Sequence, residues 1–123
     1  MPSFGNRSKE RLLTCHQDLQ KIMLDAIGVM DFTILCGHRG EEEQNEAFTN
    51  GKSNAQWPFS KHNKLPSHAV DIAPWPIDWE DTERFARLAG IIEGIAFKHD
   101  IEIKWGGDFK SIKDMPHIEL VRP

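Results

Sequence analysis

The sequence predicts an α+β fold with a small, largely antiparallel sheet and flanking helices. Two stretches have apolar residues at helical spacing, and several short β-rich runs are separated by connections of unequal length. The 123 residues can enclose one hydrophobic core and leave no room for a second unit of ordinary size. We therefore expect a single domain spanning residues 1–123.

The N-terminal half is expected to contain two helices and one strand. Ser8 is a plausible N-cap for a first helix that ends near Gly28, because the apolar residues after it recur at helical spacing. Phe32–Cys36 is β-rich and is followed by a glycine, which predicts a strand. Glu41–Thr49 predicts a short helix whose acidic first turn suits the helix dipole, with Gly51 placed to end it.

The C-terminal half begins with a polar loop over residues 52–67, and loops of this length are usually functional or disordered. Asp78 is expected to cap a helix that runs to about His99. The pair Gly106–Gly107 predicts a turn before the last strand. The expected strands are Ala69–Ala73, Ile101–Trp105 and His117–Val121.

Composition and charge exclude several classes of protein. The net charge of −4 argues against binding driven by attraction to nucleic acid or to anionic lipid. No apolar run is long enough to span a membrane, and the polar start of the chain lacks the apolar centre of a secretory signal. We therefore expect a protein that is made and first kept in the cytoplasm. Cys15 and Cys36 are expected to be free thiols.

Two clusters contain the residue types that bind metals. His62, His68 and Asp71 lie in and just after the polar loop, and Asp114 and His117 lie near the C-terminus. Zinc binds imidazole nitrogens and carboxylate oxygens, and catalytic zinc sites use three protein ligands. The helical His-Glu-x-x-His pattern of another metallopeptidase class is absent. Spacing alone leaves open whether these residues form a metal site or are scattered polar residues.

Five blocks of sequence surround these two clusters and occur in one order: Ser60–Asn63, Ala69–Pro74, Pro76–Trp79, Lys104–Asp108 and Asp114–His117. Together they resemble the D-Ala-D-Ala and L-Ala-D-Glu zinc metallopeptidase family, and most closely its single-domain phage endolysins. The likeness runs over residues 37–120. It implies the hedgehog/DD-peptidase-like zinc fold, one peptidase domain and Zn²⁺ as the cofactor.

The resemblance implies a set of metal ligands. The family's three ligands fall on His62, Asp71 and His117. The segment between His62 and Asp71 is longer than is usual in the family, so His68 remains a rival first ligand. We prefer His62, because His68 and Asp71 lie an odd number of residues apart and should point to opposite faces of a strand.

The resemblance also implies catalytic and substrate-binding residues. The family's acidic residue falls on Asp114, which would act as the base; Glu119 shares a strand face with the last histidine and is a rival base or an orienting partner. The family's arginine falls on Arg39, which would hold an oxyanion or a substrate carboxylate, with a surface ion pair as an equal alternative. Gln44 and Ser60 are expected to bind substrate, although Ser60 could equally cap a turn.

The function implied is that of a zinc-dependent peptidoglycan endopeptidase, which hydrolyses the L-Ala–D-Glu bond of the stem peptide with a metal-activated water. Its partner would be bacterial peptidoglycan, with no nucleic acid and no membrane, and we expect a monomer that reaches the wall after release through a membrane pore. Two alternatives stay open. One is a D,D-carboxypeptidase or dipeptidase acting on D-Ala-D-Ala, and the other is a non-catalytic binding module stabilised by zinc.

Overall fold

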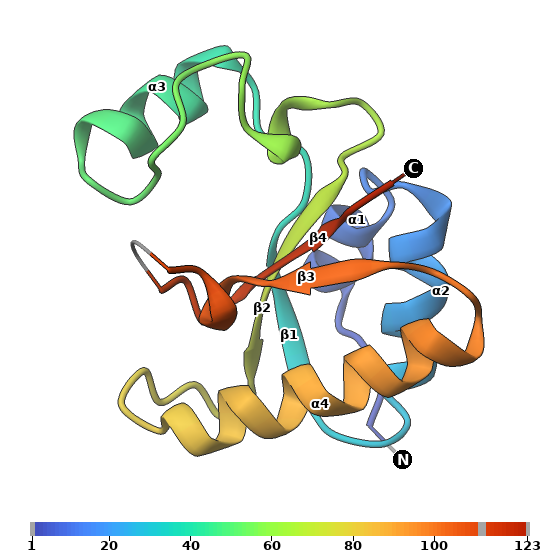
Figure 1. The fold of residues 1–123 in the computed structure, drawn as a ribbon. Helices are drawn as coiled ribbons and strands as arrows, with labels where there is room; N and C mark the ends of the chain where they lie inside the picture. The colour runs from blue at the N-terminus through green and yellow to red at the C-terminus, as the bar shows by residue number, and fades with distance from the viewer. Residues whose placement is uncertain (1, 111–112, 123) are drawn as a thin grey trace.

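The structure, a computed structural model, describes residues 2–110 and 113–122, and Figure 1 shows the arrangement of their helices and strands. The α-helices flank one sheet, and two short 3-10 helices, η1 and η2, lie in the connections. In chain order the elements are α1 (Asn6–Leu12), α2 (Gln17–Ala26), β1 (Phe32–Cys36), α3 (Glu41–Thr49), η1 (Lys61–Asn63), β2 (Ala69–Pro74), α4 (Thr82–Lys98), β3 (Ile103–Trp105), η2 (Gly106–Asp108) and β4 (His117–Leu120).

The described strands form one antiparallel sheet in the order β1-β2-β4-β3. The strands β2 and β4 are therefore central, although they are far apart in the sequence. Asp71 lies directly opposite His117 in their register, and Ala69 lies opposite Glu119. The predicted α+β class with a small antiparallel sheet and flanking helices is confirmed.

The two faces of the central strands have different roles. One face packs with α2 and α4 into the hydrophobic core. Because side chains alternate along a strand, Asp71, His117 and Glu119 point to the other face. The core residues of β2 and β4 are Val70, Ile72, Ile118 and Leu120.

The first predicted helix is in fact two helices, α1 and α2, and His16 caps the second by accepting from the Asp18 N–H. The helix breaks because the backbone between its halves binds a distant loop. The Ser67 N–H donates to the Thr14 carbonyl, and the His16 N–H donates to the Ser67 carbonyl, both at 2.8 Å. Ser8 is not the cap of α1 but lies inside it, and its hydroxyl hydrogen bonds to β1.

The start of α4 is also later than predicted. Asp81, not Asp78, caps this helix by accepting from the Arg84 N–H, while Asp78 accepts from Glu80 in the preceding turn. The turn predicted after β3 is the 3-10 helix η2. Within the described residues, no helix combines the length and the apolar character needed to cross a membrane.

Candidate active site

Asp71 and His117 meet because they are direct partners in the register of β2 and β4. Opposite residues of antiparallel strands have Cβ atoms about 5 Å apart. His117 Nδ1 lies 3.2 Å from Asp71 Oδ1, and Glu119 Oε1 lies 2.8 Å from His117 Nε2. The strand ladder thus places three of the predicted site residues side by side.

His62 reaches the same carboxylate from η1. Ser60 caps this short helix by accepting from the His62 N–H at 3.2 Å, and the Arg39 N–H donates to the His62 carbonyl at 2.8 Å. His62 is 2% exposed, and its Nε2 lies 3.1 Å from Asp71 Oδ1. Ser60 therefore serves as a cap, which is one of the two roles that the sequence left open.

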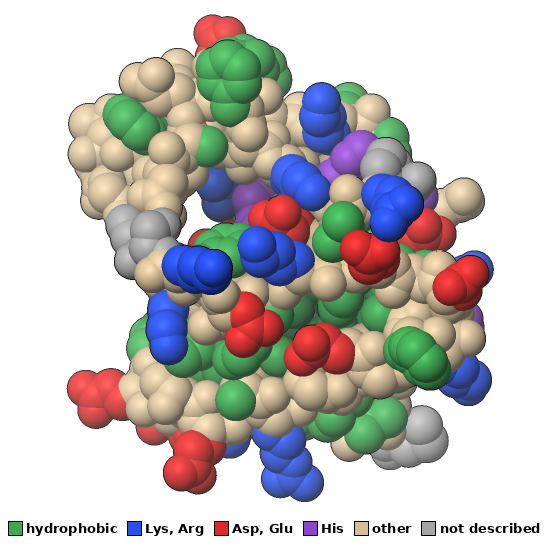
Figure 2. All heavy atoms as spheres, in the orientation of Figure 1, with side chains coloured by type: hydrophobic (Ala, Val, Ile, Leu, Met, Phe, Trp, Pro, Cys, Tyr) green, Lys and Arg blue, Asp and Glu red, His purple; other side chains and the backbone are tan. Residues whose placement is uncertain are grey.

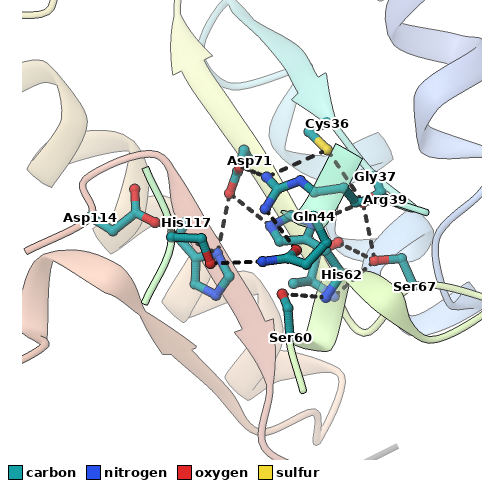
Figure 3. A network of polar contacts seen from close by, with 12 residues as sticks. Cys36, Gly37, Arg39, Gln44, Ser60, His62, Ser67, Asp71, Asp114 and His117 are labelled. Carbon is teal, nitrogen blue, oxygen red and sulfur yellow. Dashed lines mark hydrogen bonds and ion pairs between the residues drawn. The ribbon is translucent and has the colours of Figure 1, made fainter. Parts of the chain in front are cut away.

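Both imidazole rings are held through the nitrogen that points away from Asp71. His62 Nδ1 lies 2.8 Å from the Gly37 carbonyl oxygen, which can only accept, so we assign the proton to Nδ1 (Figure 3). His117 Nε2 donates in the same way to Glu119, whose other oxygen pairs with Lys61 Nζ at 3.3 Å. Such acceptors are the usual support of histidine metal ligands, because they fix the tautomer and the orientation of the ring.

The approach of two imidazoles to one carboxylate shifts the acidity of all three groups. Burial works to lower the pKa of His62, but its bonds to Asp71 and its contact with Cys36 raise it to about 10. The pKa of His117 is also raised: burial lowers it, but hydrogen bonds to Asp71 and Glu119 raise it by more. The two histidines hold the pKa of Asp71 well below its usual range, against the effect of burial. The cluster therefore favours positive charge next to Asp71, from protons or from a cation.

The donor atoms around Asp71 are of the types that zinc binds. Two groups of potential ligands share Asp71: Cys36 with His62 and Asp71, and Asp71 with Asp114 and His117, each with donor atoms within 4.8 Å of one another. The two histidines fall in different groups and are linked through Asp71 Oδ1 at 3.1 and 3.2 Å. These separations approach the roughly 3.4 Å expected between neighbouring ligands of tetrahedral zinc. Two imidazoles and a carboxylate fit this metal in chemistry, and Asp71 lies at ligand spacing from each histidine, although the two histidines do not share one group within 4.8 Å.

His68, the rival ligand, does not join the cluster. Its ring packs edge to face against His16, with ring centroids 5.6 Å apart, beside the junction of α1 and α2. His68 lies just before β2 begins at Ala69, and no described hydrogen bond or ion pair joins its side chain to Asp71. The structure thus brings His62, rather than His68, to Asp71.

Asp114 lies beside the cluster, with Oδ2 4.0 Å from His117 Nδ1 and a side chain that is 42% exposed. Burial and the Asp71 carboxylate raise the pKa of Asp114, against the opposing effect of the nearby histidines. Gly106 holds its backbone: the Asp114 N–H donates to the Gly106 carbonyl at 2.9 Å, and a Cβ at Gly106 would overlap the Asp114 carbonyl oxygen. A carboxylate of raised pKa at this position suits the exchange of a proton with a bound reactant.

Arg39 contacts the cluster from the side of α3. Its Nη2 lies 3.3 Å from Asp71 Oδ2 and 3.8 Å from Cys36 Sγ, and its Nη1 donates to Gln44 Oε1 at 3.1 Å. The guanidinium is therefore directed into the site, and the acidic first turn of α3 is not its partner among the described contacts.

Gln44 is fully buried and every hydrogen-bonding position of its amide is used. Its oxygen accepts from Arg39 and Asn63, both at 3.1 Å, and its nitrogen donates to Ser53 at 2.9 Å and to the Ala55 carbonyl at 2.6 Å. No donor or acceptor of this amide remains for a substrate. The structure places Gln44 as a support for Arg39 and η1, away from where a substrate would bind.

The cluster lies in a cleft of about 790 Å³. Figure 2 shows the hollow between the part of the molecule that contains α3 and the part that contains α4, with histidine side chains inside it. An opening of this kind gives an extended ligand access to Asp71, His117 and Asp114. Its lining includes the cations Arg39, Lys52, Lys61 and Lys113 and the aromatic residues Phe59, Trp79 and Phe109.

Several supporting groups were not singled out from the sequence. The Asn63 amide donates to the Arg39 carbonyl at 3.0 Å, and the Trp105 indole N–H donates to the Met115 carbonyl at 2.8 Å. Both residues belong to the blocks that resemble the endolysins, and this was the signal that could have found them. The Gly37 carbonyl that holds His62 is a backbone group, which leaves no such signal.

Comparisons with known proteins agree with one another. A family model described as phage L-alanyl-D-glutamate peptidase matches residues 2–121. The L-alanyl-D-glutamate peptidase of Escherichia phage T5 is 32% identical over 124 residues, which cover 97% of this chain and 89% of that protein. The crystal structure of the L-Ala D-Glu endopeptidase ChiX of Serratia marcescens is similar with a TM-score of 0.83 and 30% identity, over 97% of this chain and 90% of the other.

Proposed function

Because this chain belongs to the phage L-alanyl-D-glutamate peptidase family, we propose that it is a zinc-dependent peptidoglycan endopeptidase that hydrolyses the L-Ala–D-Glu bond of the stem peptide. The observation that carries this proposal is the meeting of His62 and His117 on one oxygen of Asp71 within an open cleft. The bond is inferred from the relatives, which are L-alanyl-D-glutamate peptidases, and the chemistry is inferred from the cluster.

We assign the metal to His62, Asp71 and His117, since each histidine already has its second nitrogen engaged by an acceptor. Zinc bound there would lower the pKa of a bound water to near 7 and polarise a substrate carbonyl. Glu119 keeps the His117 ring in place and is itself neutralised by Lys61. These contacts support an orienting role for Glu119, so we assign the base to another residue.

Asp114 is the proposed general base. It takes a proton from the attacking water and later passes it to the leaving amine of D-glutamate, and a raised pKa favours that return. Arg39 is positioned to stabilise negative charge that develops on the carbonyl oxygen, because its guanidinium is already held next to Asp71 by Gln44. We also propose a single domain that acts as a monomer. Its passage to the wall through a membrane pore is part of the same proposal.

The test combines metal content with lysis of purified cell walls. The wild-type protein should bind about one zinc per chain and lose lysis when a chelator removes it. His117→Ala should lose zinc and lysis together, while His99→Ala, which breaks an exposed ion pair with Asp25 far from the cluster, should keep both. Full lysis by metal-free His117→Ala protein would overturn the metal mechanism.

Mass spectrometry of the digested muropeptides tests the bond. New amino termini on D-glutamate and free carboxyl termini on L-alanine support the proposal, whereas released D-alanine would indicate the D,D-carboxypeptidase or dipeptidase alternative. Zinc binding with no product of either kind would indicate the non-catalytic binding module.

A further inference from the structure

Trp79 lines the cleft but has no part in the chemistry proposed above. It is 58% exposed and lies in the Pro76–Trp79 block between β2 and α4. Neither metal binding nor proton transfer explains why an exposed indole lies there. An indole left open to water forgoes the stabilisation that burial of its apolar surface would provide. The position of this exposed ring on the wall of the cleft therefore indicates that it contacts a ligand.

The Trp79 ring is fixed in position before any ligand arrives. It stacks on Phe85, with ring centroids 5.7 Å apart and planes inclined by 20°, and Phe85 is 3% exposed in the core face of α4. Arg84 ties down the same segment, because its side chain donates to the Pro76 carbonyl and pairs with Asp81. Phe85 thus covers one face of the indole, and the rest of the ring is exposed. Because the ring is already held in place, binding a ligand to it costs little conformational entropy.

The proposed substrate brings a sugar close to the scissile bond. In the peptidoglycan stem, L-alanine is joined to the lactyl group of N-acetylmuramic acid, so the sugar follows within about two residue lengths, roughly 7 Å. One side of a sugar ring presents a patch of C–H groups that packs on a flat aromatic ring. A rigid and partly exposed indole in the cleft that also contains the metal cluster matches that patch.

The lining of the cleft includes cations from several segments, among them Lys52 near α3. Lys52 follows α3, whereas Trp79 precedes α4, and Figure 1 shows these two helices on opposite sides of the molecule. On the other side of the scissile bond the stem peptide has carboxylates, beginning with the free α-carboxylate of D-glutamate. A cation at the α3 end suits that side, which leaves the sugar side for the end that contains Trp79.

We propose that Trp79 is a sugar-binding platform that stacks against the N-acetylmuramic acid ring attached to the L-alanine of the substrate. This proposal rests on the proposed function and adds a subsite to it. It gives the bound strand a direction, with the glycan over Trp79 and the carboxylates toward Lys52.

The test measures binding of two ligands that differ only in the sugar: a muramyl peptide and the same peptide without the muramyl group. Calorimetry in an Asp114→Asn background prevents turnover of either ligand. Trp79→Leu keeps apolar volume over Phe85 but removes the flat ring, and it should weaken binding of the muramyl peptide about tenfold while leaving the sugar-free peptide unchanged. Trp79→Tyr should restore most of the loss. Trp75→Leu is the matched control, since Trp75 is 56% exposed in the same connection but does not line the cleft, and it should change neither affinity.

Equal weakening of both ligands by Trp79→Leu would overturn the platform, and so would equal affinity of the unsubstituted protein for the two peptides. If Trp79→Leu does not fold, as judged by thermal unfolding, Trp79→Gln, which also removes the flat ring, takes its place: selective weakening of the muramyl peptide supports the platform, and equal weakening of both ligands overturns it. Cleavage by the wild-type protein is measured separately. Failure to cut the L-Ala–D-Glu bond would refute the proposed function, and the comparison of affinities would still decide whether Trp79 binds the sugar.

Discussion

The candidate site is built from two regions that hold their side chains by different means. On the sheet side, the register of β2 and β4 places Asp71, His117 and Glu119 next to one another. On the other side lies a segment that we call the arm, residues 37–63, which positions Arg39 and His62 through side-chain hydrogen bonds. A backbone ladder is shared by many residues, whereas a network of side chains fails when one member is removed. The arm should therefore be the more fragile of the two regions.

Within the arm, the side-chain network depends most on Gln44. Its amide connects Arg39, Asn63 and the loop at Ser53 and Ala55, and it is completely shielded from water. Asp114 is the opposite case. Its side chain is partly exposed, and its contact with the cluster is a 4.0 Å approach to His117. Substitution of Asp114 should affect the chemistry alone, while substitution of Gln44 should affect the whole arm.

The largest expected effect follows from Asp114→Asn. The change keeps the shape of the side chain and removes its ability to accept a proton, so the rate of cleavage should fall by about 10²–10⁴-fold. Zinc content and thermal stability should match the wild type. Asp108→Asn, an exposed acid in the same connection, is the control and should retain activity. Undiminished lysis by Asp114→Asn would move the role of base to Glu119.

Gln44→Ala tests the fragility of the arm. It leaves buried donors and acceptors without partners, which should lower the free energy of unfolding by about 2–3 kcal/mol. Zinc affinity and activity should decrease with it, because Arg39 and His62 lose their support. Urea unfolding and zinc titration measure both effects, with Asn45→Ala on the exposed side of α3 as the control. A stable Gln44→Ala protein with normal zinc affinity would remove the distinction between the two regions.

Glu119→Gln probes the sheet side with a smaller expected loss. The amide still accepts from His117 Nε2 but no longer balances Lys61. Loss of a carboxylate that supports a histidine ligand typically lowers metal affinity about 10–100-fold. We expect this loss in a zinc competition assay, with the free energy of unfolding of the metal-free protein near that of the wild type. A drop in stability as large as that of Gln44→Ala would show that the sheet side is equally interdependent.

The same contrast explains how far the sequence could be interpreted. The period of two along a strand was enough to predict that Glu119 shares a face with His117, because this depends on local geometry. The same period does not apply to His68, because this residue lies just before β2 begins. The burial of Gln44 was beyond such reasoning, since its four partners come from three separate parts of the arm.

The division of the first helix had the same kind of cause. The apolar spacing was continuous, and the break arises from backbone pairing with Ser67, a residue distant in sequence. Resemblance to a family located the blocks that surround the site, but it did not distinguish residues that would touch a substrate from residues that support them.

The last prediction concerns pH, which removes protons and leaves every side chain in place. In the metal-free protein the pKa of His62 is raised from 6.5 to about 10, and that of His117 is raised as well. A raised pKa in the folded state stabilises the protein below the unfolded value and loses this contribution as the pH passes the folded value. Thermal stability with a chelator should therefore decline between pH 6.5 and about 10. Zinc replaces those protons, so the zinc-loaded protein should not share the decline, and the gap between the two melting temperatures should widen as the pH rises. A metal-free protein whose melting temperature stays constant or rises over this interval would show that the imidazoles of the arm and of the sheet are not held by Asp71 through their charge.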